Sequence, residues 1–252
     1  MRALMLVGAA TAGLALTAPV MASDPPHAPS VNWSFNGLFG TFDRGALQRG
    51  SQVYSEVCAS CHSLSLLSYR NLRAIGFSED QVKKIAAEVE IEDGPNDEGE
   101  MFERAGRPGD RFKAPFANSQ AARASNGGAL PPDLSLMTKA RKNGANYLHA
   151  LLTGFTDPPA DKEIAEGMSY NVYYPGGQIA MAPPLSEDIV EYADKTKATV
   201  PQMAHDVTTF LAWAAEPELE ERKRMGVKVV LFLIVLTGLF YAIKRRVWAD
   251  LH

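Results

Sequence analysis

The motif Cys58-Ala59-Ser60-Cys61-His62 contains both cysteines of this 252-residue chain. Its spacing, C-x-x-C-H, is the signature of covalent haem attachment. Each of the two thiols can form a thioether with one vinyl group of a haem. The imidazole that follows can then bind the iron through a neutral ring nitrogen. The motif therefore predicts one haem c, with Cys58 and Cys61 as attachment points and His62 as an axial ligand.

Three other uses of a C-x-x-C pair are less consistent with the sequence. A thioredoxin-type redox pair belongs to a βαβ unit, whereas the segment before Cys58 has helical periodicity. A structural zinc site usually takes its ligands from two such pairs, and there is no second pair. A disulfide bond that closes so small a loop would stabilise little. We therefore assign the pair to haem and expect no disulfide bond in the chain.

The residues around the motif predict a mostly α-helical domain with long loops. Asp43 is a suitable N-cap for a helix that runs to Val57, because apolar and small residues recur there at three- and four-residue steps. We expect further helices over 79–89, 146–152 and 200–215, and one that begins at Pro217 and continues towards the C-terminus. The segments 93–132 and 154–184 are rich in Gly, Pro and Asn, and loops of that length need something to pack around.

The local sequence leaves the second axial ligand open between two methionines of the 154–184 loop, Met168 and Met181. Met181 is favoured, because glycines before it allow close approach of the backbone and Pro183 and Pro184 stiffen the chain after it. Two lone helical histidines are alternatives, His149 and His205. Four methionines are poor candidates, because they lie in an acidic stretch, at a membrane edge or in expected helices: Met101, Met225, Met137 and Met203.

The second ligand decides the chemistry. An open position on the iron would favour reactions with oxygen or peroxide, whereas a closed His/Met pair favours electron transfer and raises the reduction potential. A single-haem enzyme or ligand sensor is therefore the alternative to an electron carrier.

The two ends of the chain predict export and a membrane anchor. Residues 1–22 fit a signal peptide, with a positive Arg2, a short apolar run and small residues before Ser23. Residues 226–243 form a second apolar run that only Lys228 interrupts. As a helix, this run would be about 27 Å long, close to the roughly 30 Å thickness of a bilayer core. We expect an extracytoplasmic haem domain over 23–215, a juxtamembrane helix over 216–225, the anchor over 226–243 and a cytoplasmic tail over 244–252.

Charge limits the partners. A net charge of −4 makes nucleic acid an unsuitable partner. Residues 88–103 contain eight acidic residues and no Lys or Arg. This stretch is either a solvated loop or an electrostatic guide for a basic soluble cytochrome c. In the second case, neutralising Glu90, Glu92 and Asp93 would slow reduction of that cytochrome, most of all at low salt.

With these features, the sequence resembles the cytochrome c1 family, the haem c subunit of the ubiquinol:cytochrome c oxidoreductase (cytochrome bc1) complex, in its bacterial form. The resemblance covers nearly the whole chain after the signal peptide. It rests on an ordered set of segments: Arg49-Gly50 and Val53 to Val57 before the haem motif, Gly128 to Ser135, Met181 to Leu185, Phe210 to Pro217, and Arg222 to Gly226.

The resemblance implies a class I cytochrome c-like haem domain plus one C-terminal transmembrane helix. It implies His62 and Met181 as the axial ligands, and Arg141 and Tyr147 as hydrogen-bond partners of a haem propionate. A carbonyl within 130–132 would orient His62, and Gly50 and Tyr54 would meet the helix around 210–213. Some bacterial relatives carry a disulfide bond or an insertion near the methionine. This chain has neither, so we expect only packing and prolines to brace that loop.

The resemblance also implies a function. The chain would accept one electron from a Rieske iron–sulfur protein and pass it to a soluble c-type cytochrome, within a dimeric complex that contains a cytochrome b subunit. The isolated chain would catalyse no reaction of its own. It would cross the bacterial inner membrane once, in contact with membrane lipid, with its haem domain in the periplasm and its C-terminus in the cytoplasm.

Overall fold

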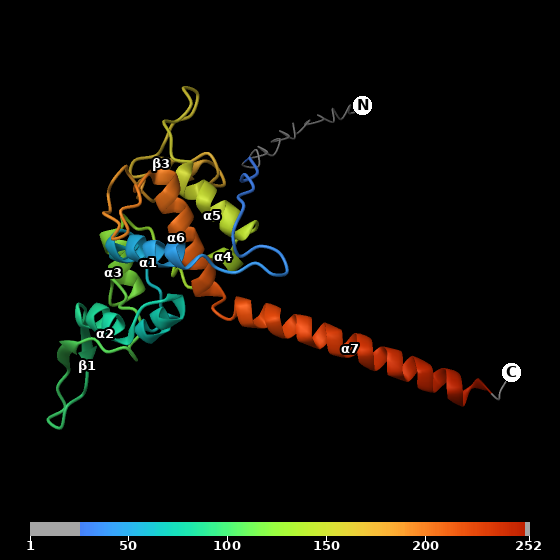
Figure 1. Ribbon diagram of the computed structural model, residues 1–252. Coiled ribbons are helices and arrows are strands. Elements are labelled where there is room, and N and C mark those ends of the chain that lie inside the picture. The colour runs from blue at the N-terminus through green and yellow to red at the C-terminus, as the bar shows by residue number, and fades with distance from the viewer. Residues whose placement is uncertain (1–25, 250–252) are drawn as a thin grey trace, which may run out of the picture.

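Helices dominate the structure, a computed structural model that describes residues 26–249 (Figure 1). The predicted signal peptide over 1–22 lies outside the described residues. The elements are α1 (Arg44–Glu56), η1 (Cys58–Ser60), η2 (Tyr69–Ile75), α2 (Glu79–Ala87), β1 (Glu90–Asp93), β2 (Phe102–Ala105), α3 (Ser119–Ser125), α4 (Met137–Ala140), α5 (Gly144–Thr153), β3 (Ser169–Tyr170), β4 (Gln178–Ile179), α6 (Val200–Ala215) and α7 (Leu219–Val247). The mostly α-helical class is confirmed.

The predicted helices correspond to α1, α2, α5 and α6. Asp43 caps α1, its side chain accepting a hydrogen bond from the backbone N–H of Ala46, and Ser78 caps α2 in the same way through Gln81. The last helix begins at Leu219 and not at Pro217, because a turn in which the Leu219 N–H donates to Glu216 O separates it from α6. The long loops contain structure that was not predicted, namely the antiparallel pairs β1–β2 and β3–β4 and the short helix α3.

The centre of the domain is the crossing of α1 and α6. A Cβ atom added at Gly50 would lie 2.0 Å from the backbone oxygen of Asp206 and 2.8 Å from the Cβ atom of Phe210, so only glycine permits this approach. The rings of Tyr54 and Phe210 pack with centroids 5.9 Å apart, and both side chains are buried. The predicted meeting of Gly50 and Tyr54 with the Phe210 helix is confirmed.

A buried ion pair fixes the same crossing. Arg49 donates through Nε to Oδ2 of Asp206 at 2.8 Å and through Nη2 to Oδ1 at 3.2 Å, and the Asp206 side chain is fully buried. Gln202 donates to both carboxylate oxygens. Burial alone would raise the pKa of Asp206, but these hydrogen bonds outweigh it and hold the pKa below its ordinary value. The carboxylate therefore stays charged, and its bidentate partner specifies how the two helices dock.

Helix α7 projects away from the domain (Figure 1). It has 29 residues, its most apolar 18-residue window has a mean hydropathy of 2.3, and it is long and apolar enough to cross a membrane. Residues 219–225 of the predicted juxtamembrane helix and the predicted anchor over 226–243 form one continuous helix, which extends to Val247. Its base is tied to the domain by the ion pairs of Glu220 with Arg44 and of Arg222 with Glu216, the C-cap residue of α6.

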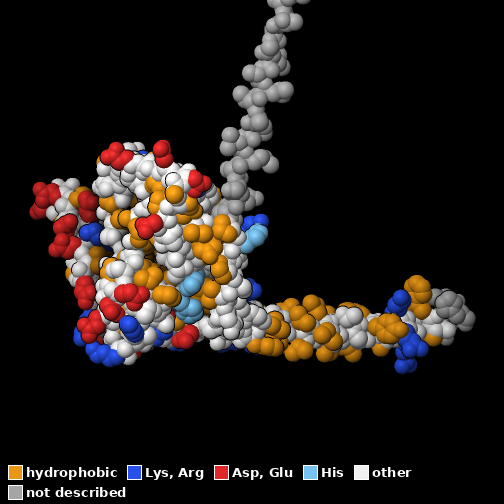
Figure 2. Space-filling view, turned by 90° about the horizontal axis from the view of Figure 1, so that it is seen from above, with side chains coloured by type: hydrophobic (Ala, Val, Ile, Leu, Met, Phe, Trp, Pro, Cys, Tyr) orange, Lys and Arg blue, Asp and Glu red, His pale blue; other side chains and the backbone are white. Residues whose placement is uncertain are grey.

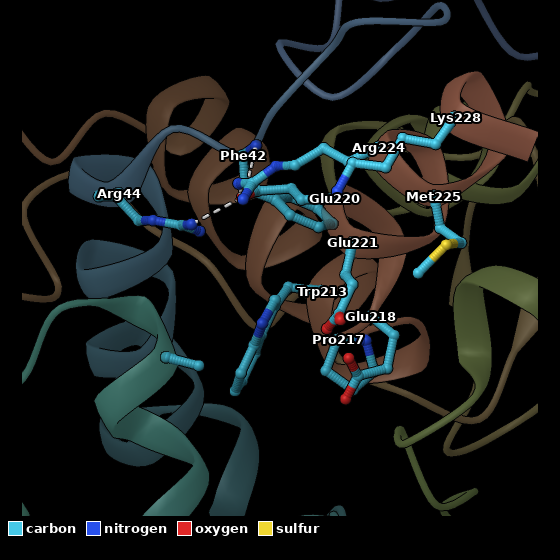
Figure 3. Close-up of a pocket in the computed structure, with 11 residues that line it drawn as sticks. Phe42, Arg44, Trp213, Pro217, Glu218, Glu220, Glu221, Arg224, Met225 and Lys228 are labelled. Carbon is cyan, nitrogen blue, oxygen red and sulfur yellow. Dashed lines mark hydrogen bonds and ion pairs between the residues drawn. The ribbon is translucent and has the colours of Figure 1, made fainter. Parts of the chain in front are cut away.

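A cleft of about 430 Å³ opens beside this base (Figure 3). Its lining includes Phe42, Trp213 and Met225 together with the cationic side chains of Arg224 and Lys228. None of the residues predicted to hold the haem contributes to it.

Candidate functional site

The C-x-x-C-H motif occupies the tight turn that ends α1. The His62 N–H donates to Cys58 O at 2.9 Å and the Cys61 N–H donates to the same oxygen at 3.2 Å, which closes the η1 turn. Both cysteines are half-buried. Burial, with a smaller contribution from Cys61, raises the pKa of the Cys58 thiol to about 12. A redox-active dithiol needs a lowered pKa, so this environment does not suit thioredoxin-type chemistry.

The ring of His62 is held by a backbone carbonyl. Its Nδ1 lies 2.8 Å from Pro132 O, and because a carbonyl only accepts hydrogen bonds, Nδ1 carries the proton. The other ring nitrogen, Nε2, is then free to bind a metal. Burial lowers the pKa of His62 despite the opposing effects of Pro132 and Asp133, which favours the neutral ring. The predicted orientation of His62 by a carbonyl within 130–132 is confirmed.

Asp133 clamps this carbonyl against the motif. Its carboxylate accepts hydrogen bonds from Ser63 Oγ at 2.8 Å and from the N–H groups of Ser65 and Ser135 at 2.9 and 2.8 Å. Burial would raise the pKa of Asp133, but the hydrogen bonds outweigh it and lower the pKa to about 2. This role was not predicted. The sequence carried only a weak indication of it, an Asp two residues before Ser135, which is a pattern typical of an Asx turn.

The predicted ligand Met181 follows β4. Its side chain is half-buried and packs against the hydrophobic core, as do the side chains of Cys58 and Tyr147. Met168 lies in the turn before β3, where its N–H donates to Ala165 O. The other methionines behave as expected from their positions: Met137 and Met203 are buried core residues, and Met101 and Met225 are exposed.

The Met181 loop has braces that were not predicted. Strand β3 pairs with β4 in antiparallel register, with Ser169 opposite Ile179. The fully buried Asn171 donates through Nδ2 to Leu151 O of α5 at 2.7 Å, and its N–H donates to Gly177 O at 2.9 Å. The expectation that packing and prolines alone hold this loop is therefore wrong. A short strand pair closes the loop on itself, and the buried amide of Asn171 ties it to α5.

The two residues predicted to bind a haem propionate lie on either side of the α4–α5 turn. Arg141 is exposed, and its Nη1 donates to the adjacent Ala140 O at 3.3 Å. Tyr147 is half-buried in α5. Burial raises the pKa of its hydroxyl, and the charge of Arg141 opposes that shift. A cation beside a phenol at the edge of the core is suitable for binding a carboxylate.

The two alternative histidines are engaged elsewhere. The ring of His205 stacks on Trp33 with centroids 4.9 Å apart, and His149 meets the same indole edge-on at 6.0 Å. They help to dock the segment before α1 onto α5 and α6.

Taken together, these donors fit a covalently bound haem. They comprise a cysteine pair in a tight turn, an imidazole with one fixed tautomer, a thioether on the core, and a cation beside a phenol. Within residues 26–249 there is no group of three or more His, Cys, Asp or Glu side chains that could hold a metal ion alone.

Comparisons with known proteins identify the family of the chain. The model of the Cytochrome C1 family matches residues 33–251. The chain is 52% identical over 255 residues to "Cytochrome c1 1, heme protein, mitochondrial" of Arabidopsis thaliana, covering 99% of this chain and 83% of that protein. It is 49% identical over 235 residues to "Cytochrome c1" of Rhodospirillum rubrum, covering 87% and 86% of the two chains.

The name of a third relative combines two cytochromes. "Cytochrome b/c1" of Bradyrhizobium diazoefficiens is 52% identical over 252 residues, which cover 91% of this chain and 36% of that longer protein. Because the family model matches most of the chain, and relatives about half identical align along nearly all of it, the chain belongs to the cytochrome C1 family.

Proposed function

We propose that this chain binds one haem c covalently through Cys58 and Cys61, with His62 and Met181 as axial ligands, and that it passes single electrons. As a member of the cytochrome C1 family, it is a redox component of the cytochrome bc1 complex. The observation that most supports the proposed ligation is the 2.8 Å contact from His62 Nδ1 to Pro132 O, because it leaves the second nitrogen of a neutral imidazole free for the iron.

The bound haem would supply a one-electron change of iron charge. The chain's own residues would keep the positions of both iron ligands constant. Pro132 and Asp133 hold the ring of His62, and the Asn171 brace holds the loop of Met181, so neither ligand needs to move when the charge changes. With His62 and Met181 both bound, the iron would have no open position for oxygen or peroxide. Arg141 and Tyr147 would bind a propionate at the domain edge.

The proposed partners follow from the family and from the presence of the long apolar helix α7. The name of the Bradyrhizobium relative joins cytochrome b and c1, which supports cytochrome b as a partner. A Rieske iron–sulfur protein would donate the electron and a soluble c-type cytochrome would accept it. We also propose that α7 crosses the bacterial inner membrane, with the haem domain in the periplasm and the C-terminus in the cytoplasm.

The hairpin formed by β1 and β2 is the proposed docking element for the soluble acceptor. Figure 2 shows acidic side chains gathered at the end of the domain opposite α7, where Figure 1 places this hairpin. In the register, Glu92 lies directly opposite Glu103, and Glu90 is on the same face of the pair. Like charges so placed repel one another and raise the local negative potential, which a basic partner would relieve.

Asp93 belongs to the other face and has a structural role. It forms an ion pair with Arg104, which also contacts Asp110 at 2.6 Å. The hydrogen bond from the Arg104 side chain lowers the pKa of Asp110 to about 2, and the charge of Arg104 adds to this effect. Neutralising Asp93 would therefore disturb the hairpin as well as its charge. The set of residues to test becomes Glu90, Glu92 and Glu103.

The triple variant Glu90→Gln, Glu92→Gln, Glu103→Gln should slow reduction of a basic soluble cytochrome c by about tenfold at low salt, with the difference vanishing at high salt. The rate is measured with ubiquinol as donor, in the complex purified through a tag on this chain. Cytochrome b and an iron–sulfur protein are expected in that preparation.

A matched control removes the same charge elsewhere. Asp157, Glu163 and Glu166 are exposed on the loop before β3, and changing them to Asn, Gln and Gln should leave the rate near that of the parent. Equal rates and equal salt dependence for both triples would show that the hairpin does not guide the acceptor. Absence of cytochrome b and the iron–sulfur protein from the preparation would contradict the proposed complex.

A further inference from the structure

Two large apolar side chains lie at the tip of a turn near the base of α7. We call residues 36–40 the finger. Leu38 is 62% exposed and Phe39 is 79% exposed, the highest value of any large apolar side chain in the described part of the chain. An isolated exposed Leu is ordinary, but two adjacent and strongly exposed apolar residues on a turn usually mark a contact surface.

The finger has a defined shape. Gly37 has a φ of 72°, and a Cβ atom added at Gly40 would lie 1.9 Å from the backbone oxygen of Asn36, so the turn requires glycine on both sides of its tip. At its base, Phe35 and Phe42 are buried with ring centroids 4.9 Å apart. The two apolar side chains are therefore held pointing outward by a turn with a defined backbone conformation.

The finger is also fixed to the membrane-proximal part of α7. Lys223 Nζ donates to Phe35 O at 2.6 Å and to Gly40 O at 3.0 Å, one bond to each side of the tip. The Phe42 N–H donates to Glu220 Oε1 at 2.9 Å (Figure 3). Lys223 precedes Lys228, the one charged residue within the apolar run, by roughly 8 Å of helix. This spacing places the finger at the level expected for the lipid headgroups.

The cleft at the base of α7 is lined by charges of both signs: Arg44, Arg224 and Lys228 together with Glu218, Glu220 and Glu221. Lys228 lies near the start of the apolar run, where a cation can interact with lipid phosphates. In Figure 1 the blue loop before α1 lies on the side of the domain from which α7 departs.

We infer that Leu38 and Phe39 insert into the lipid interface of the membrane that α7 crosses. This inference rests on the proposed anchoring by α7. A single helix leaves the domain free to tilt and rotate about its base, and a second, apolar contact at the interface restricts both motions. The finger would thereby set the orientation of the haem domain above the membrane.

Site-directed spin labelling tests this contact. Because both native cysteines lie in the haem motif, Phe39→Cys introduces one free thiol for a nitroxide in the thioether-bound protein. The full chain is reconstituted into vesicles of phosphatidylethanolamine and phosphatidylglycerol, and all labels are compared with the haem in the same oxidation state and without added reductant. The accessibility of the label to apolar oxygen is then compared with its accessibility to a water-soluble nickel chelate. Matched labels are placed at Val235→Cys in the apolar run and at Glu98→Cys on the hairpin.

The oxygen-to-nickel accessibility ratio at position 39 should exceed that at position 98 severalfold and lie below that at position 235. A ratio at 39 equal to that at 98, with a membrane-type value at 235, would overturn the finger contact while leaving the anchor in place. A label at 39 shielded from both reagents would also overturn it, because protein would then cover the tip. A water-like value at 235 would show that the proposed anchor itself had failed, and the inference with it.

Discussion

Replacing Met181 with leucine will lower the reduction potential of the haem and allow carbon monoxide to bind the reduced iron. Leucine has a similar volume, so the packing of the side chain against the core should survive. It has no sulfur to offer the iron. Axial ligands tune haem potentials over roughly 0.8 V, and loss of the thioether should lower the potential by on the order of 0.1 V or more. A shift of about 0.1 V changes a one-electron equilibrium by about 50-fold.

The matched control is Met168→Leu, in the same loop and of the same chemistry. Its redox titration should overlay that of the parent protein, and its reduced form should not bind carbon monoxide. If the potential fell in the Met168 variant and not in the Met181 variant, the sixth ligand would be Met168. If neither variant changed the potential, the proposed methionine ligation would be wrong.

Replacing Gly50 with alanine should destabilise the domain by about 3 kcal/mol or more. The added Cβ atom would lie 2.0 Å from the backbone oxygen of Asp206, and backbone atoms cannot move aside as a flexible side chain can. The crossing of α1 and α6 would have to widen, which would also strain the buried pair of Arg49 and Asp206. A total stability of roughly 5–15 kcal/mol makes such a loss easy to measure by chemical denaturation.

Gly45→Ala provides the control on the same helix. There the added Cβ atom would approach only the ends of the Arg49 and Asp43 side chains, at 3.3 Å. Alanine is the better helix former, so this variant should be neutral or more stable by about 0.5–1 kcal/mol. Equal stability of the two variants would show that the close approach of α1 and α6 does not limit the fold.

Local patterns predicted most of the helical framework. Helix α1 with its Asp43 cap and helix α6 follow from periodicity and capping, which depend on neighbours in the sequence. The strand pairs did not follow, because β3 and β4 are two residues each and β1–β2 is an exposed, charged hairpin without an apolar alternation. A period of two cannot be recognised in segments so short or so polar.

The residues of the site could be predicted from the sequence only in part. The motif residues Cys58, Cys61 and His62 follow from their spacing. Local pattern favoured Met181 over Met168 without excluding Met168, and the family resemblance strengthened that choice. The clamp by Asp133 and the brace by Asn171 depend on partners far away in the chain. Neither an Asp nor an Asn can be assigned such a structural role from the sequence alone. Tertiary contacts decide which polar side chains are structural.

The most direct measurement is the optical absorption spectrum of the purified full chain, recorded oxidised, reduced, and reduced under carbon monoxide. We predict a low-spin, six-coordinate haem with thioether-linked vinyl groups, whose reduced spectrum carbon monoxide leaves unchanged. Protein without a porphyrin would contradict the proposed haem attachment. A high-spin haem that readily binds carbon monoxide would contradict the proposed His/Met ligation and indicate a haem enzyme or a ligand sensor.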